Sequence, residues 1–277
     1  MRLADGRRIG VHRSSGRGPV TVFLHGLMDS RAGWSETVDA LGRPSFALDL
    51  PGFGVSDLPT RPRLSAYADD VAEALERLGV GRAHVVGHSL GGAVAASLAD
   101  RHPQRVASLL LLAPAGFGRI ALAEAVSVPG IRQLTRLGLG LSLGSGASVR
   151  LAYRAMVSNG MALEAEMLER LQGHGAPQLI PAAIAGTQAV VAAGLSERAM
   201  HRRRLAYDGP AIAVWGDRDR LVPPSHAEGL RTGLPQASVH VWRGMGHHPQ
   251  RERPAQLLSV LRAAAARRPR VAAALAA

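Results

Sequence analysis

The chain has 277 residues, of which 47% are hydrophobic and none is cysteine. This length can bury one large core with room for an inserted lid, and the absence of cysteine excludes disulfides, thiolate metal sites and a cysteine nucleophile. The formal net charge is +12, but the 33 basic residues are all arginines spread along the chain, and aromatic residues make up only 4%. Nucleic-acid binding is therefore not expected, because it favours clustered positive charge with aromatic side chains that stack on bases.

The N-terminus does not have the pattern of a targeting signal. Residues 1–8 lack the apolar stretch of a secretory signal peptide. No 18-residue uncharged apolar run appears in the chain, so we expect no integral membrane segment. We predict a cytoplasmic protein.

The chain begins with two short predicted β elements. Residues 2–13 have the pattern of a β-hairpin with Asp5 and Gly6 in its turn. Residues 20–24 form a continuous apolar run bounded by turn signals, which is typical of a strand buried on both faces of a parallel sheet.

Helices and strands then alternate. Trp34 and Val38 lie one helical turn apart within residues 31–41, which predicts a helix packed on the sheet. Residues 45–48 form the next predicted strand, and Ser65 is the expected N-cap of an amphipathic helix that follows.

Residues 87–92 read Gly-His-Ser-Leu-Gly-Gly and lie between a short apolar strand at 84–86 and a helical stretch at 93–99. Strand, G-x-S-x-G and helix in that order indicate a nucleophile elbow, a sharp turn that exposes a serine hydroxyl above the sheet. In so tight a turn Ser89 is expected to have a positive φ, and glycine at both flanking positions leaves room for neighbouring backbone.

After a further buried strand at residues 106–112, the alternation stops. Residues 116–207 contain no convincing strand and have helical patterns at 163–171 and 182–195. Helices inserted between two strands are best interpreted as a cap over the mouth of the sheet. The cap contains four methionines that fit core packing or an apolar pocket lining: Met156, Met161, Met167 and Met200.

The alternation resumes with predicted strands at residues 211–215 and 237–242, each followed by a polar loop, and a closing helix from Pro254 to about residue 266. The predicted fold class is α/β, with a mostly parallel, doubly wound sheet and an inserted helical cap. We expect the core domain to comprise residues 1–115 and 208–277, and the cap to comprise residues 116–207.

These segments resemble the α/β-hydrolase fold family over nearly the whole chain. Four of them look like family motifs in the family's order: Leu24-His25-Gly26, the stretch from Asp49 to Asp57, the elbow at Ser89, and two loops near the C-terminus. We call these two the acid loop (residues 216–223) and the histidine loop (residues 244–254). The order of Ser89, Asp219 and His247 agrees with the serine, acid, histidine order of that fold.

The resemblance implies a catalytic triad. Ser89 is the expected nucleophile, His247 the base that takes its proton, and Asp219 the carboxylate that fixes the imidazole and stabilises its charged form. Asp217 on the acid loop is the alternative acid, although the family pattern Gly-x-x-Asp-x-x-x-Pro favours Asp219. His248 is the alternative base, although Gly-His-x-Pro-x-x-Glu-x-Pro favours His247.

By the same resemblance, the backbone N–H groups of Leu27 and Leu90 form the oxyanion hole. Leu90 stands at the start of a predicted helix, where free N–H groups and the helix dipole favour negative charge. The other histidines show no spacing with carboxylates that is typical of a metal site, so we expect no metal and no cofactor.

Serine rather than aspartate at position 89 indicates acyl transfer through an acyl-enzyme. The leading hypothesis is hydrolysis of a carboxylic ester of a small or medium apolar substrate. The alternatives are a C–C bond hydrolase of meta-ring-cleavage products, whose elbow commonly reads Gly-Asn-Ser-Met-Gly, and a cofactor-free haloperoxidase-like enzyme or an acyltransferase with the same triad. A non-catalytic binding protein on the same fold is the alternative from a different class.

Overall fold

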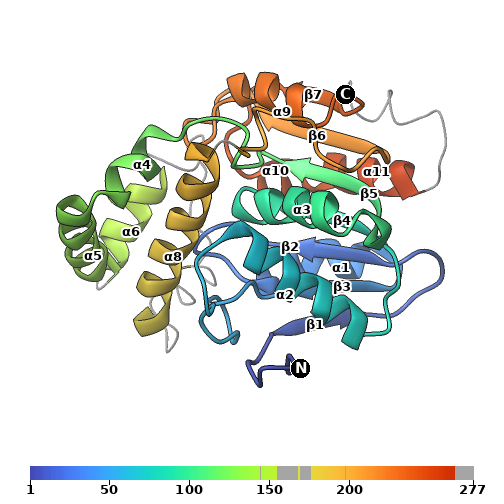
Figure 1. Cartoon of the computed structure of the whole chain (residues 1–277), viewed down its shortest axis with the longest axis horizontal. Helices are drawn as coiled ribbons and strands as arrows, with labels where there is room; N and C mark the ends of the chain where they lie inside the picture. The colour runs from blue at the N-terminus through green and yellow to red at the C-terminus, as the bar shows by residue number, and fades with distance from the viewer. Residues whose placement is uncertain (144, 155–167, 169–175, 197, 266–277) are drawn as a thin grey trace.

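Seven strands form one sheet in the computed structural model, which describes residues 1–143, 145–154, 168, 176–196 and 198–265 (Figure 1). Their order across the sheet is β1-β3-β2-β4-β5-β6-β7; β1 is antiparallel to β3, and all other neighbours are parallel. The strands are β1 (Val11–Ser14), β2 (Thr21–Leu24), β3 (Ser45–Leu48), β4 (Ala83–His88), β5 (Val106–Leu112), β6 (Ala211–Gly216) and β7 (Ser238–Trp242).

Both faces of the sheet are covered, because successive side chains of each central strand enter different cores. In β5, Leu109 and Leu111 pack in one hydrophobic cluster while Leu110 and Leu112 pack in the other. The first cluster includes residues of α2 (Leu64–Arg77) and α3 (Leu90–Arg101), and the second includes residues of α1 (Ser35–Leu41) and α11 (Pro254–Ala265). The mostly parallel, doubly wound α/β sheet predicted from continuous apolar runs is confirmed.

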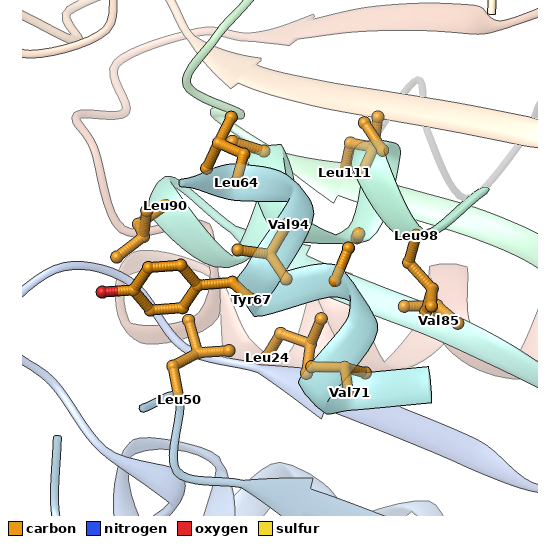
Figure 2. Packing of buried hydrophobic residues seen from close by; sticks show 14 of the residues in the cluster. Leu24, Leu50, Leu64, Tyr67, Val71, Val85, Leu90, Val94, Leu98 and Leu111 are labelled. Carbon is orange, nitrogen blue, oxygen red and sulfur yellow. The ribbon is translucent and has the colours of Figure 1, made fainter. Parts of the chain in front are cut away.

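The larger core fixes α2 and α3 against the middle of the sheet (Figure 2). Tyr67 of α2 lies between Leu50 and Leu90, and Val71 points toward Leu24 at the end of β2. Each of these apolar side chains is at least 97% buried. Full burial of one such side chain is worth roughly 1.5–3 kcal/mol, so the start of α3 is held firmly over the ends of the central strands.

Four helices lie between β5 and β6 in the described part of the chain, and no strand does. They are α4 (Ala121–Ser127), α5 (Pro129–Leu143), α6 (Gly146–Ala152) and α8 (Ala176–Leu195). Figure 1 shows them together on the side toward which the arrows of β2 and β5 point. The helix expected at 182–195 is part of α8, whereas the pattern at 163–171 falls almost entirely outside the described residues.

Of the four methionines named above, the structure describes only Met200. Met200 is buried in the larger core, so core packing applies to it. The other three, Met156, Met161 and Met167, lie outside the described residues.

Helix α8 corrects one statement made from the sequence. Its segment Gln178–Leu195 is uncharged, has a mean hydropathy of 1.4 and is long enough to cross a membrane. A single helix of this kind is weak evidence for a membrane span, because the core helix of a globular protein has the same length and composition. One face of α8 packs on the rest of the fold, where Ala182 is fully buried and a Cβ on Gly52 would lie 2.7 Å from the Ala182 Cβ.

The hairpin expected at residues 2–13 forms around its turn, but its extent is wrong. Arg2 and Arg8 form an antiparallel bridge, the Leu3 N–H donates to the Arg7 carbonyl at 2.9 Å, and the Ile9 N–H donates to the Met1 carbonyl at 3.0 Å. Beyond Ile9 the second arm leaves the first, and Val11–Ser14 pairs with β3 instead. The other side of this arm binds the loop after β3, because the Arg8 N–H donates to the Asp57 carboxylate at 2.7 Å and the Arg8 carbonyl accepts the Asp57 N–H at 3.0 Å.

The N-cap expected at Ser65 is also wrong. Helix α2 begins one residue earlier, at Leu64, with Arg63 in an extended conformation before it and no side-chain cap. Leu64 is 5% exposed within the larger core, so tertiary packing draws it into the first turn.

Candidate active site

Ser89 occupies a strained turn between β4 and α3. Its φ of 51° and ψ of −114° lie outside the regions that residues with a side chain normally adopt. Two backbone hydrogen bonds hold this conformation: the Ser89 N–H donates to the Leu112 carbonyl at 2.9 Å, and the Ser89 carbonyl accepts the Ala115 N–H at 3.0 Å. The positive φ expected for an elbow serine is present.

Glycine is required on both sides of this serine because backbone passes too close for a side chain. A Cβ on Gly91 would lie 2.3 Å from the Leu24 carbonyl oxygen and 2.5 Å from that of His25. A Cβ on Gly87 would lie 2.4 Å from the Gly91 carbonyl oxygen. These neighbours are backbone atoms, so they cannot rotate away as the end of a side chain could.

The structure brings Asp219 and His247 together. Asp219 Oδ2 lies 2.7 Å from His247 Nδ1, and both residues are buried. The other oxygen, Asp219 Oδ1, accepts the N–H groups of Leu221 and Val222 at 2.9 Å each. Because a carboxylate accepts from Nδ1, this contact favours the tautomer with a proton on Nδ1 and leaves His247 Nε2 able to accept one.

The two alternative residues have other partners or surroundings. Asp217 has no hydrogen bond or ion pair to a histidine among the described residues; its Oδ1 accepts the Met245 N–H at 3.3 Å and so braces the histidine loop. His248 Nδ1 is buried and has no hydrogen-bond partner among the described residues. Burial, together with neighbouring His88, holds the pKa of His248 well below its ordinary value, so this ring stays neutral.

Contacts between distant loops hold the histidine loop, and sequence reasoning did not find them. The Glu252 carboxylate accepts the Gly246 N–H at 2.7 Å and the His248 N–H at 3.0 Å. A buried ion pair joins Arg251 Nη2 to Asp29 Oδ2 at 3.2 Å, linking the histidine loop to the loop after β2. Glu252 belongs to the quoted histidine motif, which was a usable signal, whereas no local pattern pairs Asp29 with Arg251.

The two predicted oxyanion residues flank the turn. Neither the Leu27 N–H nor the Leu90 N–H is donated to a protein acceptor among the described residues. Next to Leu27, Met28 has a φ of 60°, a second strained residue at this edge. Helix α8 lies directly over both: a Cβ on Gly186 would be 2.9 Å from Leu27 Cδ1 and 3.0 Å from Leu90 Cδ2.

No group of three or more histidine, aspartate or glutamate side chains suited to a metal ion occurs among the residues that the structure describes. The groups that gather at the carboxyl ends of the strands are instead a strained serine, a buried carboxylate-bound imidazole and two free backbone donors. This arrangement on a doubly wound sheet defines an α/β protein whose site suits attack on a carbonyl group.

Comparison with known proteins agrees with that class. Residues 19–254 match the model of the alpha/beta hydrolase fold, and the chain belongs to this family.

Three similar proteins illustrate the family's range. The acetyltransferase component of the acetoin cleaving system of Cupriavidus necator is 32% identical over 257 residues, which are 90% of this chain but only 64% of that protein. A 2-hydroxy-6-oxo-6-phenylhexa-2,4-dienoate hydrolase of Comamonas testosteroni is 29% identical over 87% of this chain and 86% of its own. The solved structure of an N-acyl homoserine lactone degrading enzyme has a TM-score of 0.70 and 25% identity, covering 93% of this chain and 97% of its own. The chain spans less than two thirds of the first of these proteins, and the likeness to all three shows the family to which it belongs.

The close packing at Gly91 gives a testable prediction for stability. Gly91→Ala should lower the free energy of unfolding by about 1–3 kcal/mol, because the clash with two carbonyl oxygens outweighs the roughly 1 kcal/mol that alanine gains over glycine in a helix. Gly194→Ala in α8 is the matched control, since a Cβ there meets nothing within 4 Å. Urea unfolding of both variants measures the difference, and a Gly91→Ala variant as stable as the parent chain would contradict the packing argument.

Proposed function

We propose that the protein is a serine hydrolase that cleaves a carboxylic ester, or a related acyl bond, through an acyl-enzyme. The observation that supports this most directly is the 2.7 Å contact between Asp219 Oδ2 and His247 Nδ1, on loops at the same edge of the sheet as the strained Ser89 turn. In this proposal Ser89 is the nucleophile, His247 the general base and Asp219 the acid of the triad.

The proposed reaction has two halves. Ser89 Oγ attacks the carbonyl carbon while its proton passes to His247 Nε2, and Asp219 stabilises the imidazolium that forms. The N–H groups of Leu27 and Leu90 donate to the oxyanion; one such donor is worth roughly 3 kcal/mol in enzymes where it has been removed. As the intermediate collapses, the leaving alkoxide takes the proton from His247. Water then repeats the sequence on the acyl-enzyme and releases the acid.

Residues 116–207 are the proposed cap, with residues 1–115 and 208–277 as the core domain. Helix α8 supports this division, because it comes from the inserted region and packs on both proposed oxyanion residues through Gly186. Its composition over Gln178–Leu195 is apolar and uncharged. An apolar helix over the site favours a substrate with a small or medium apolar acyl group.

A C–C bond hydrolase of meta-ring-cleavage products is the second candidate, and the likeness to the Comamonas testosteroni hydrolase favours it. An acyltransferase is supported in the same way by the Cupriavidus necator relative, of which this chain spans 64%. A haloperoxidase-like reaction uses the same triad without a cofactor. A non-catalytic binding protein is the alternative that would need none of the three side chains.

Covalent labelling tests the nucleophile. A fluorophosphonate probe should modify the folded protein at Ser89, and Ser89→Ala and His247→Ala should each lower kcat by about 10³-fold or more while the fold persists. Mass spectrometry locates the label, and circular dichroism checks the fold. A native chain that takes no label at Ser89 would exclude the serine-hydrolase proposal and favour a binding protein.

Paired substitutions test the acid. Asp219→Asn should lower kcat by about 10³- to 10⁴-fold, because an amide no longer stabilises the imidazolium or fixes its tautomer. Asp217→Asn is the matched control: its amide oxygen can still accept the Met245 N–H, so kcat should change by no more than a few-fold. The reverse pattern, with activity lost in Asp217→Asn alone, would reassign the acid.

A substrate panel tests the reaction class. We expect kcat/KM to be highest for p-nitrophenyl esters of short to medium acyl chains, since these place an apolar acyl group beneath α8. The same assay with a vinylogous diketone measures C–C cleavage, and added alcohols or thiols as acceptors measure acyl transfer. A diketone kcat/KM above that of every ester would favour the second candidate instead.

A further inference from the structure

His88, the residue before the elbow serine, connects the elbow to the histidine loop. It ends β4 and is 2% exposed. Its Nε2 lies 2.8 Å from the backbone carbonyl oxygen of His247, a residue 159 positions later in the chain. Because a carbonyl oxygen only accepts, the hydrogen in this contact must be on Nε2 of His88.

The surroundings of His88 fix this donor state. Nδ1 is buried and has no hydrogen-bond partner within the described part of the chain. It faces Gly26, where an added Cβ would lie only 2.7 Å away. The ring packs against those of His247 and His248, with both centroid distances at 4.9 Å. Burial, and next the proximity of His247, lower the pKa of His88 well below its ordinary value. The ring is therefore a neutral imidazole with its single proton on Nε2.

We propose that His88 is a positioning residue: its Nε2–H fixes the backbone of His247 so that the imidazole of His247 is held at the correct distance from Ser89. This inference rests on the proposed serine-hydrolase function. Asp219 fixes His247 at Nδ1, which sets the rotation of the ring. His88 holds the backbone of the same residue, and the two contacts together determine where His247 Nε2 lies.

The geometry explains why this contact suits a site that needs close alignment. His88 and Ser89 are adjacent, so the hydrogen bond places the base relative to the residue next to the nucleophile. Without it, Glu252, which accepts the N–H groups of Gly246 and His248, would still hold the loop in place. The base would remain near the serine but less well aligned, and a displacement of about 1 Å can cost on the order of 100-fold in rate.

Two substitutions of His88 separate positioning from simple packing. His88→Leu removes the donor, and we expect kcat to fall about 30- to 100-fold with KM changed by less than about 3-fold. His88→Gln carries a side-chain N–H₂ that can reach the same carbonyl oxygen, and it should recover kcat to within about 5-fold of the parent chain. If His88 only packed against its neighbours, kcat would depend on the shape of the side chain and the stability of the variant, and restoring a donor would not restore kcat.

His84→Leu is the matched control, because His84 lies in the same strand and contacts Ser108 Oγ at 2.6 Å, at the opposite end of β4 from the elbow. It should leave kcat within about 2-fold of the parent value whatever it does to thermal stability. The positioning role is refuted if His88→Leu keeps kcat within 2-fold, or if His88→Gln loses as much as His88→Leu.

Two further readouts keep this inference separate from the proposed function. Fluorophosphonate labelling of the parent chain at Ser89 tests the function alone; if labelling succeeds and His88→Leu is labelled as fast as the parent, only the positioning role fails. Nitrogen-15 NMR of the full chain tests the contact without activity. We expect the His88 ring to be neutral with its proton on Nε2 at pH 6, and a proton on Nδ1 would overturn the inference.

Discussion

The close approach of α3 to the end of β2 is the constraint on which the rest of the site depends. It is possible only because residue 91 is glycine: any Cβ there would overlap two carbonyl oxygens of the Leu24-His25 segment. This approach brings the first N–H of α3, on Leu90, beside the loop that carries Leu27. The chain enters α3 through the turn at Ser89, whose φ is 51°, so the start of the helix and the serine depend on the same close contact.

Strain is concentrated at this edge of the sheet. Three non-glycine residues among those described have positive φ, namely Met28, Ser89 and Ala113, and all follow the carboxyl ends of central strands. Such conformations cost of order 1–3 kcal/mol each. The core offsets this cost, since one fully buried leucine or valine side chain contributes a comparable amount and both faces of the sheet are filled with them. A rigid sheet can therefore hold an unfavourable turn in place.

The sequence predicted those features that depend on local pattern. Buried parallel strands appear as continuous apolar runs, and the elbow depends on glycines two positions either side of Ser89, so both were found. The hairpin at residues 2–13 was predicted too long because Val11–Ser14 pairs with β3, a strand far along the chain, and not with the first arm. The contacts that hold the histidine loop were missed for the same reason: His88 meets His247 across 159 residues, and Asp29 meets Arg251 across 222. Hydrophobic periodicity is a local pattern, so it carries no information about contacts between residues this far apart in the chain.

The charge states of the imidazoles packed around the proposed base affect the charge that the base itself can take. His247 contacts the rings of His88 and His248 at 4.9 and 5.3 Å, and two unit charges at such a distance repel by about 3 kcal/mol at an effective dielectric of 20. A charged neighbour would oppose the imidazolium that must form on His247 in the proposed mechanism. Burial lowers the pKa of both neighbours, so they remain neutral, and Arg251, the nearby permanent cation, is paired with Asp29. Of these three imidazoles, only that of His247 has a carboxylate partner, so the packing of its neighbours and the hydrogen bond with Asp219 both favour it as the proposed base.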